Sequence, residues 1–188
     1  MDTYKLKLTR LQNEIFRLLT IYSGKEFNIR GIAKLLRVSP TSVSKAILTL
    51  SKKEIILVDK SKTMNLTYVK FNRDNPKSVN MKRVENLKIL YESGLSEYLE
   101  DKFPGCTLVL FGSYSRGEDV FFGEMDDKNS DVDIAIVGTK EKEVNLEKFE
   151  DFIKMDININ FYESWDKIHK NLKNNILNGI ILSGGVEL

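Results

Sequence analysis

The chain has 188 residues, 41% of them hydrophobic and 30% charged, and its formal net charge is +2. This size and composition fit one ordinary folded domain or two small ones, with a well-solvated surface. A single cysteine and a single histidine exclude a disulfide framework and argue against a zinc centre. Apolar runs are too short to span a bilayer and no signal-peptide pattern opens the chain, so we expect a cytoplasmic protein that does not bind membranes.

The charge is divided unevenly along the chain. Residues 1–83 hold 18 Lys and Arg against 6 Asp and Glu, and residues 84–188 hold 11 against 21, so the two parts carry +12 and −10. This split predicts two units with different partners, a polyanion for the first and cations for the second. Two solvated surfaces that merely attract each other are the plainer alternative.

The first part contains three helical patterns followed by two strand patterns. Helical spacing of apolar residues covers 8–22, 28–38 and 39–53, and the third pattern begins with Ser39 as N-cap and Pro40 at the first helical position. Strand patterns over 55–58 and 66–71 flank a basic turn. The third helix turns outward short polar or basic side chains that suit phosphates and base edges; these are Thr41, Ser42, Ser44, Lys45 and Lys52.

This order of elements resembles the winged helix-turn-helix family over about residues 5–73. The resemblance implies that the 39–53 helix is the recognition helix and that the turn with Lys60 and Lys62 is the wing. It also implies double-stranded DNA as a partner and a homodimer as the assembly. A winged helix that contacts proteins instead of DNA stays open as an alternative.

The residues that follow predict a junction and then a second domain. Residues 74–80 are polar and contain Pro76, so we expect an exposed, irregular linker between domains at 1–73 and 81–188. Helical spacing then covers 84–102, 146–153 and 165–182, and strand patterns cover 106–113, 131–138 and 155–162. The fold class expected for the chain is α+β, with a mixed β-sheet and flanking helices in the second domain.

Two short stretches of the second domain suggest phosphate and metal chemistry. Alternation along the strand at 131–138 puts Asp131 and Asp133 on one face, about 6.6 Å apart. Carboxylates so placed repel each other unless a cation joins them, and Mg²⁺ binds carboxylates together with phosphate oxygens. The Gly112-Ser113 turn ends the preceding strand, and a glycine lets a phosphate approach the backbone. Arg116 could add a charge-assisted contact to that phosphate.

The stretches "VLFGSYSRG" and "SDVDIAIVG" resemble the minimal nucleotidyltransferase family of the DNA polymerase β-like superfamily, over about residues 81–185. The resemblance implies that Gly112 and Ser113 bind nucleotide phosphates and that Asp131 and Asp133 bind Mg²⁺. It implies a third carboxylate that completes the metal site and can act as a base on the acceptor hydroxyl. Asp156 is the best match for it, although Glu163 lies nearby in the sequence. The reaction implied is transfer of a nucleoside monophosphate from an NTP, foremost ATP, with release of pyrophosphate.

Three functions remain open at this point. The chain could be an enzyme tethered to a DNA-binding module, or a transcription regulator whose nucleotidyltransferase-like domain senses a nucleotide or a partner. It could also be a toxin–antitoxin component, because members of this family are often encoded beside a HEPN-type partner that they nucleotidylate. The acceptor could be a protein hydroxyl, an RNA end or a small molecule.

One spacing departs from the family pattern. Seventeen residues separate Ser113 from Asp131, which is longer than usual, and the excess lies in residues 120–128. This insertion could be a flap over the site or a packing loop.

Overall fold

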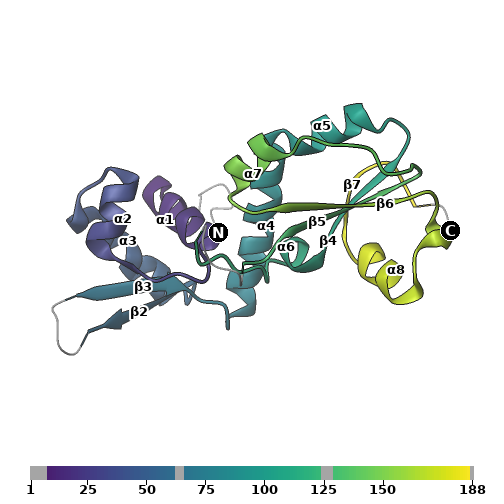
Figure 1. Ribbon diagram of the computed structural model, residues 1–188. Coiled ribbons are helices and arrows are strands. Elements are labelled where there is room, and N and C mark those ends of the chain that lie inside the picture. Colours follow the sequence, from purple (N-terminus) through teal and green to yellow (C-terminus); the bar gives the residue numbers. More distant parts are fainter. Residues whose placement is uncertain (1–7, 62–65, 124–128, 187–188) are drawn as a thin grey trace, which may run out of the picture. The chain divides into compact units, whose positions relative to one another are not determined.

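The computed structural model describes residues 8–61, 66–123 and 129–186, and the chain divides into two compact units, Met1–Val79 and Asn80–Leu188 (Figure 1). The elements of the first unit are α1 (Arg10–Ile21), β1 (Phe27–Asn28), α2 (Ile29–Leu36), α3 (Pro40–Lys52), β2 (Ile56–Lys60) and β3 (Thr67–Phe71). Strand β3 pairs antiparallel with both β1 and β2, so the sheet order is β1-β3-β2. A helix-turn-helix followed by a β-hairpin is the winged helix-turn-helix arrangement that the sequence predicts.

Helix caps explain where the helices of the first unit begin. Thr9, Asn28 and Ser39 each accept a hydrogen bond from a backbone N–H of the helix that follows. The inner faces of the three helices then bury one apolar core; its fully buried members include Ile15, Leu19, Ile32, Val43 and Leu50. Strand β1 was not expected from the sequence, because two residues are too few to show alternation.

The expected linker is corrected by the structure. Residues 76–80, predicted to be irregular, belong instead to helix α4 (Pro76–Ser93), although Pro76, Lys77 and Asn80 are exposed as predicted. Asn75 caps this helix through a hydrogen bond from the Lys77 N–H to its Oδ1 (2.9 Å), and Pro76 occupies the first helical position. Ser78 is fully buried and donates a hydrogen bond to the Glu54 carbonyl oxygen. The sequence pattern predicts that Pro76 prevents a helix, whereas in the structure Pro76 starts one.

The second unit contains a four-stranded sheet with helices on both faces. After α4 its elements are α5 (Leu95–Lys102), β4 (Thr107–Phe111), α6 (Gly112–Arg116), β5 (Val132–Val137), α7 (Glu147–Ile153), β6 (Ile157–Tyr162), a 3₁₀ turn (Trp165–Lys167), α8 (Lys170–Leu177) and β7 (Ile180–Ser183). The strand order is β6-β5-β4-β7; β5 and β6 are parallel and the other pairs antiparallel, which makes the sheet mixed. Helices α5 and α7 lie on the opposite side of this sheet from α8 (Figure 1).

Two helix predictions in the second unit are wrong in part. The pattern over 84–102 is two helices, because Gly94 interrupts it with a left-handed φ of 76°. The pattern over 165–182 is not one helix, because residues 180–183 form β7 and pair with β4. Apolar residues in this last segment fit a helix or a strand, and the open edge of β4 decides in favour of the strand.

One face of the sheet leads directly to the acidic residues. Val109, Phe111, Ala135 and Val137 are buried on it, together with Ile168 and Ile176 from the C-terminal part of the chain. Side chains alternate along a strand, so Asp133 and Asp131 continue the same face toward the start of β5. There Asp133 is half-buried and Asp131 is exposed. In the described part of the chain, no helix is both long and apolar enough to cross a membrane.

Candidate active site

The glycine turn and the acidic strand meet at the end of β4. Phe111, the last residue of β4, is the register partner of Asp133 on β5. Gly112 follows with a φ of 75°, and a Cβ placed on it would overlap Oδ2 of Asp133. A side chain at position 112 would therefore collide with the Asp133 carboxylate, and the backbone conformation also favours glycine. The structure brings Gly112 and Asp133 together, and phosphate binding at this turn stays a prediction.

Helix α6 holds the rest of the turn. Ser113 is half-buried in its first turn, and the buried Ser115 donates from Oγ to the Gly112 carbonyl oxygen (2.9 Å). The helix ends at Gly117, which has a φ of 74°. Arg116 is exposed, and its Nε lies 2.7 Å from Oε2 of Glu118. Arg116 is thus engaged in a surface ion pair, and its contact with a phosphate stays a prediction.

The two aspartates share a third polar neighbour, Asn158. This residue is the register partner of Asp133 on β6, and its Nδ2 donates to Oδ2 of Asp131 (2.9 Å). Burial raises the pKa of Asp133, the nearby Asp131 charge raises it further, and a hydrogen bond from Asn158 lowers it. The raised pKa means that the ionised pair is disfavoured here, which a bound cation would relieve. Alternation along the 155–162 strand pattern puts Asn158 and Asn160 on the same face, so the sequence alone gives no reason to prefer Asn158.

Asp156 lies apart from this arrangement. It is exposed, immediately precedes β6, and its carbonyl oxygen accepts a hydrogen bond from the Val132 N–H (2.9 Å), which puts it level with Asp131. It lines a pocket of 290 Å³ with acidic residues of α7, among them Glu150 and Asp151. Over the three described stretches, no three Asp, Glu, His or Cys side chains are grouped closely enough to hold a metal ion. The third carboxylate therefore stays a prediction.

Glu163, the alternative third carboxylate, does not share the site. It follows Tyr162, the partner of Val137 at the far end of β5, whereas Asp131 precedes the start of that strand. Its Oε1 lies 3.5 Å from Nζ of Lys140. Parallel pairing of β5 and β6 thus separates Glu163 from the aspartates by the length of the strand.

Comparison with protein families decides what this sheet unit is. The family model for the nucleotidyltransferase domain matches residues 92–182. The chain contains a nucleotidyltransferase domain. The matched residues include the Gly112-Ser113 turn, Asp131, Asp133 and Asp156. A comparison with curated proteins found no significant match.

The long connection inside the nucleotidyltransferase domain is closed at its base. Val120 N–H donates to Oγ of Ser130 (3.0 Å), and Ser130 N–H donates to the Val120 carbonyl oxygen (2.8 Å). Phe121 is buried, whereas Phe122 is exposed. Residues 124–128 lie outside the described residues, so the flap interpretation of the insertion stays untested while its base packs as a loop.

The predicted DNA-binding residues are mostly solvent-accessible. Thr41, Lys45 and Lys52 on α3 are exposed, Ser44 is half-buried, and Lys60 is exposed at the end of β2. The hydroxyl of the exposed Ser42 lies 2.8 Å from Oγ of Ser39, at the start of α3. Lys62 lies outside the described residues. These positions agree with a polar, basic outer face on α3 and leave the DNA contacts themselves as predictions.

Solved structures similar to the chain include two bacterial regulators. The adhesin competence repressor (AdcR) from Streptococcus pyogenes is 24% identical, with a TM-score of 0.40 over 52% of this chain and 69% of that one. ZitR from Lactococcus lactis, a zinc-responsive MarR family member, is 24% identical, with a TM-score of 0.38 over 55% of this chain and 68% of that one. A single-substitution mutant of ZitR in complex with DNA is 25% identical, with a TM-score of 0.39 over 55% and 68%. These scores are low, so the winged helix-turn-helix assignment rests on the topology of the first unit itself.

Proposed function

We propose that the chain is a Mg²⁺-dependent nucleotidyltransferase coupled to a DNA-binding module. The sheet domain would transfer a nucleoside monophosphate from an NTP to an acceptor hydroxyl. The observation that carries this proposal is the close approach of the Gly112 backbone to the Asp133 carboxylate. The nucleotidyltransferase family match over residues 92–182 supports it independently.

The candidate site residues would have separate roles in binding the metal, binding the phosphates and accepting a proton. Asp131 and Asp133 would hold Mg²⁺, which when bound neutralises charge on the triphosphate. Gly112 lets the backbone approach the Asp133 carboxylate closely, and Ser113 would offer a hydroxyl and an N–H to the phosphate oxygens. In the reaction, the acceptor oxygen bonds to the α-phosphorus and the bond to the β-bridging oxygen breaks, so pyrophosphate leaves. We propose that Asp156 accepts the proton of the acceptor hydroxyl, since it is the carboxylate level with Asp131 directly before the neighbouring strand.

The first unit would bind double-stranded DNA through α3 and the wing. The excess of basic over acidic residues in 1–83 supports binding to a polyanion, and the exposed Lys45 and Lys52 place charge on the outer face of α3. We propose Thr41, Ser42 and Ser44 as further contacts, because short polar side chains at the start of such a helix reach phosphates and bases.

The test is a turnover assay with the full chain. The protein is mixed with Mg²⁺, each of the four NTPs labelled at the α-phosphate, and a panel of protein, RNA and small-molecule acceptors. We expect pyrophosphate release and label transfer, and we expect Asp133→Asn to reduce both by at least about 10³-fold. Asp166→Asn, an exposed aspartate in the 3₁₀ turn, is the matched control and should retain activity.

The other outcomes separate the remaining functions. NTP-dependent changes in DNA binding without any pyrophosphate would favour a regulator that senses nucleotide. Labelling of a HEPN-type protein in preference to RNA or small molecules would favour the toxin–antitoxin role. Absence of both NTP binding and pyrophosphate at every metal concentration would refute the enzyme proposal.

A further inference from the structure

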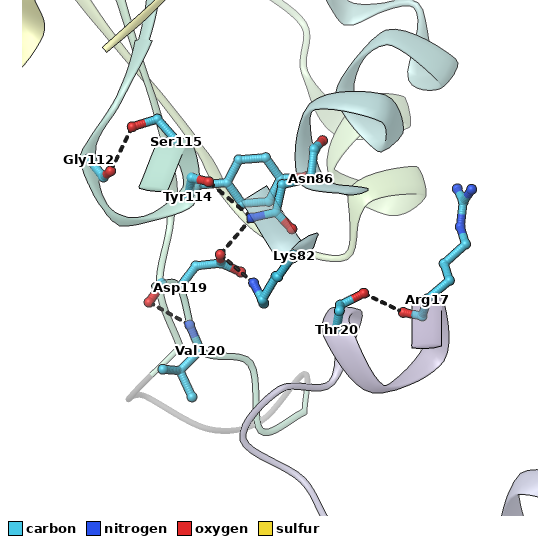
Figure 2. A network of polar contacts seen from close by, with 10 residues as sticks. Arg17, Thr20, Lys82, Asn86, Gly112, Tyr114, Ser115, Asp119 and Val120 are labelled. Carbon is cyan, nitrogen blue, oxygen red and sulfur yellow. Dashed lines mark hydrogen bonds and ion pairs between the residues drawn. The ribbon is translucent and has the colours of Figure 1, made fainter. Parts of the chain in front are cut away.

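A group of buried polar residues lies behind the glycine turn. Lys82 and Asn86 are one turn apart on α4, and Lys82 is fully buried while Asn86 is 4% exposed. Asp119, in the segment after α6, is 1% exposed and forms an ion pair with Nζ of Lys82. Figure 2 shows these residues converging with Tyr114 of α6. None of them was selected from the sequence, and none takes part in the chemistry proposed above.

Asn86 connects α4 to α6 in both directions. Its Nδ2 donates to the Tyr114 carbonyl oxygen (3.0 Å) and to Oδ1 of Asp119 (2.7 Å). The Tyr114 hydroxyl donates in return to the Asn86 carbonyl oxygen (3.1 Å). Tyr114 is two residues after Gly112, and Ser115 bonds back to the Gly112 carbonyl oxygen (Figure 2). The hydrogen bonds between Asn86 and Tyr114 therefore hold α6, and with it the Gly112-Ser113 turn, against α4.

The same group also reaches the acidic strand. Asp119 is followed by Val120, which exchanges two hydrogen bonds with Ser130. Ser130 is the residue directly before Asp131. Lys82 and Asn86 of α4 are thus connected through hydrogen bonds, an ion pair and short chain segments to the glycine turn and to Asp131.

Packing alone does not explain a buried ion pair at this place. Moving two charges from water into the protein interior has a free-energy cost that burying apolar side chains of similar volume does not have. Buried ion pairs are therefore weak contributors to stability. Charged and amide groups do impose a geometry, because each buried polar atom needs its partner at a fixed position. This is the property required to hold two short segments in register around a site.

We propose that Lys82, Asp119 and Asn86 are positioning residues that hold the Gly112-Ser113 turn against Asp131 and Asp133. The effect on nucleotide binding rests on the proposed function, whereas the effect on the turn does not. Both parts are tested on the full chain, with separate measurements.

The first measurement is backbone amide hydrogen exchange without nucleotide or metal. In Asn86→Ala, exchange in the peptide over residues 112–118 should be at least about tenfold faster, whereas β5 and β6 keep their protection. Tyr114→Phe removes one hydrogen bond of the group and should give the same local pattern more weakly. Lys88→Ala, an exposed ion-pair residue on the same helix, is the control and should change nothing.

The second measurement separates positioning from folding. The double variant Lys82→Met with Asp119→Leu replaces the ion pair by apolar side chains of similar volume, so its thermal midpoint should stay near the wild-type value. Its α6 exchange should nevertheless rise, and KM for the NTP should rise about tenfold or more with a smaller change in kcat. The conservative Asp119→Glu variant should recover part of the protection.

Each result has a definite reading. Unchanged α6 exchange in all variants, or exchange raised uniformly across the second unit, overturns the positioning role. The chain could bind no NTP while its variants still show faster exchange confined to α6. That result would support the positioning role and refute the proposed function.

Discussion

Among the candidate site residues, Gly112 is the one whose identity the geometry constrains most. Gly112→Ala combines a left-handed backbone with a collision against Oδ2 of Asp133, so we expect NTP affinity to fall at least about tenfold and stability by about 1–3 kcal/mol. Gly105→Ala is the matched control, because Gly105 has a φ of 79° but a Cβ added there would meet nothing within 4 Å. Isothermal calorimetry and denaturant titration measure both changes. Equal losses in the two variants would show that backbone strain alone matters.

The raised pKa of Asp133 predicts in which direction stability changes with pH. A carboxyl whose pKa is higher in the folded than in the unfolded chain favours folding at low pH, and this contribution is lost as pH rises through the folded pKa. At neutral pH and without metal, Asp133→Asn should therefore raise the thermal midpoint. The increase should be only about 1–3 °C, because solvent screens the charge of the half-buried group. Asp166→Asn should leave it unchanged. A lower midpoint for Asp133→Asn would contradict the raised pKa that burial and the nearby Asp131 charge give to Asp133.

Protons should also compete with the cation at this residue. A raised pKa means that Asp133 begins to protonate at a pH above the ordinary aspartate value of about 3.9. The stabilisation that wild type gains from Mg²⁺ should consequently shrink as pH falls toward that range, since the ligand must be ionised. Thermal melts with and without Mg²⁺ across a pH series measure this loss. A Mg²⁺ effect that stays constant through the series would exclude Asp133 as a ligand.

Single residues differ in how far the sequence reveals them. Gly112, Asp131 and Asp133 could be selected because a glycine turn and an Asp-x-Asp pair carry their chemistry in their spacing. Lys82 and Asp119 could not, because two charged residues 37 positions apart look like separate surface residues until the fold brings them together. Asn158 shows a further limit, since its register against Asp133 exists only in the paired sheet.

At the scale of elements, local sequence did not predict the two-residue β1 or, with more consequence for the sheet of the second unit, β7. Gly179 precedes it, and a Cβ there would overlap the Leu110 carbonyl oxygen and lie 2.9 Å from Cγ1 of Val109. The chain must pass this close to β4 before it can pair with it. The tight approach is a tertiary requirement, and the helical spacing of the neighbouring apolar residues conceals it.

Gly179→Ala should accordingly weaken the attachment of β7. We expect a loss of about 1–3 kcal/mol in the free energy of unfolding, because the added methyl group is overpacked against the β4 backbone. Gly185→Ala is the control, since Gly185 has nothing within 4 Å of a Cβ and no left-handed φ, and it should be nearly neutral. Urea denaturation compares the two. A neutral Gly179→Ala would mean that β4 and β7 separate easily at this point.

For the whole molecule, the division of charge yields a prediction about DNA. Lys45→Ala and Lys52→Ala should each weaken binding to a mixed-sequence duplex and reduce the slope of log affinity against log salt by about 1. Lys167→Ala, an exposed lysine of the second unit, should not. Fluorescence anisotropy at several salt concentrations supplies both values. Equal effects of all three substitutions would mean that the duplex is attracted without a defined contact on α3.

The two-part organisation was the most predictable property of the chain. Composition, caps and hydrophobic spacing act over short distances, so the winged helix-turn-helix and the strands β4, β5 and β6 follow from them. The junction was less predictable, because Asn75-Pro76 reads either as a loop or as a helix start, and the capping hydrogen bond decides.

The closed base of the insertion bears on how such a domain can change in length. Val120 and Ser130 are joined by two hydrogen bonds, so the chain leaves and re-enters the site region at one place. Residues gained or lost between these two points need not move Asp119 on one side or Asp131 on the other. A motif whose spacing exceeds the family pattern can therefore keep the family geometry, and a search for related chains should allow the distance between the glycine turn and the acidic pair to vary freely.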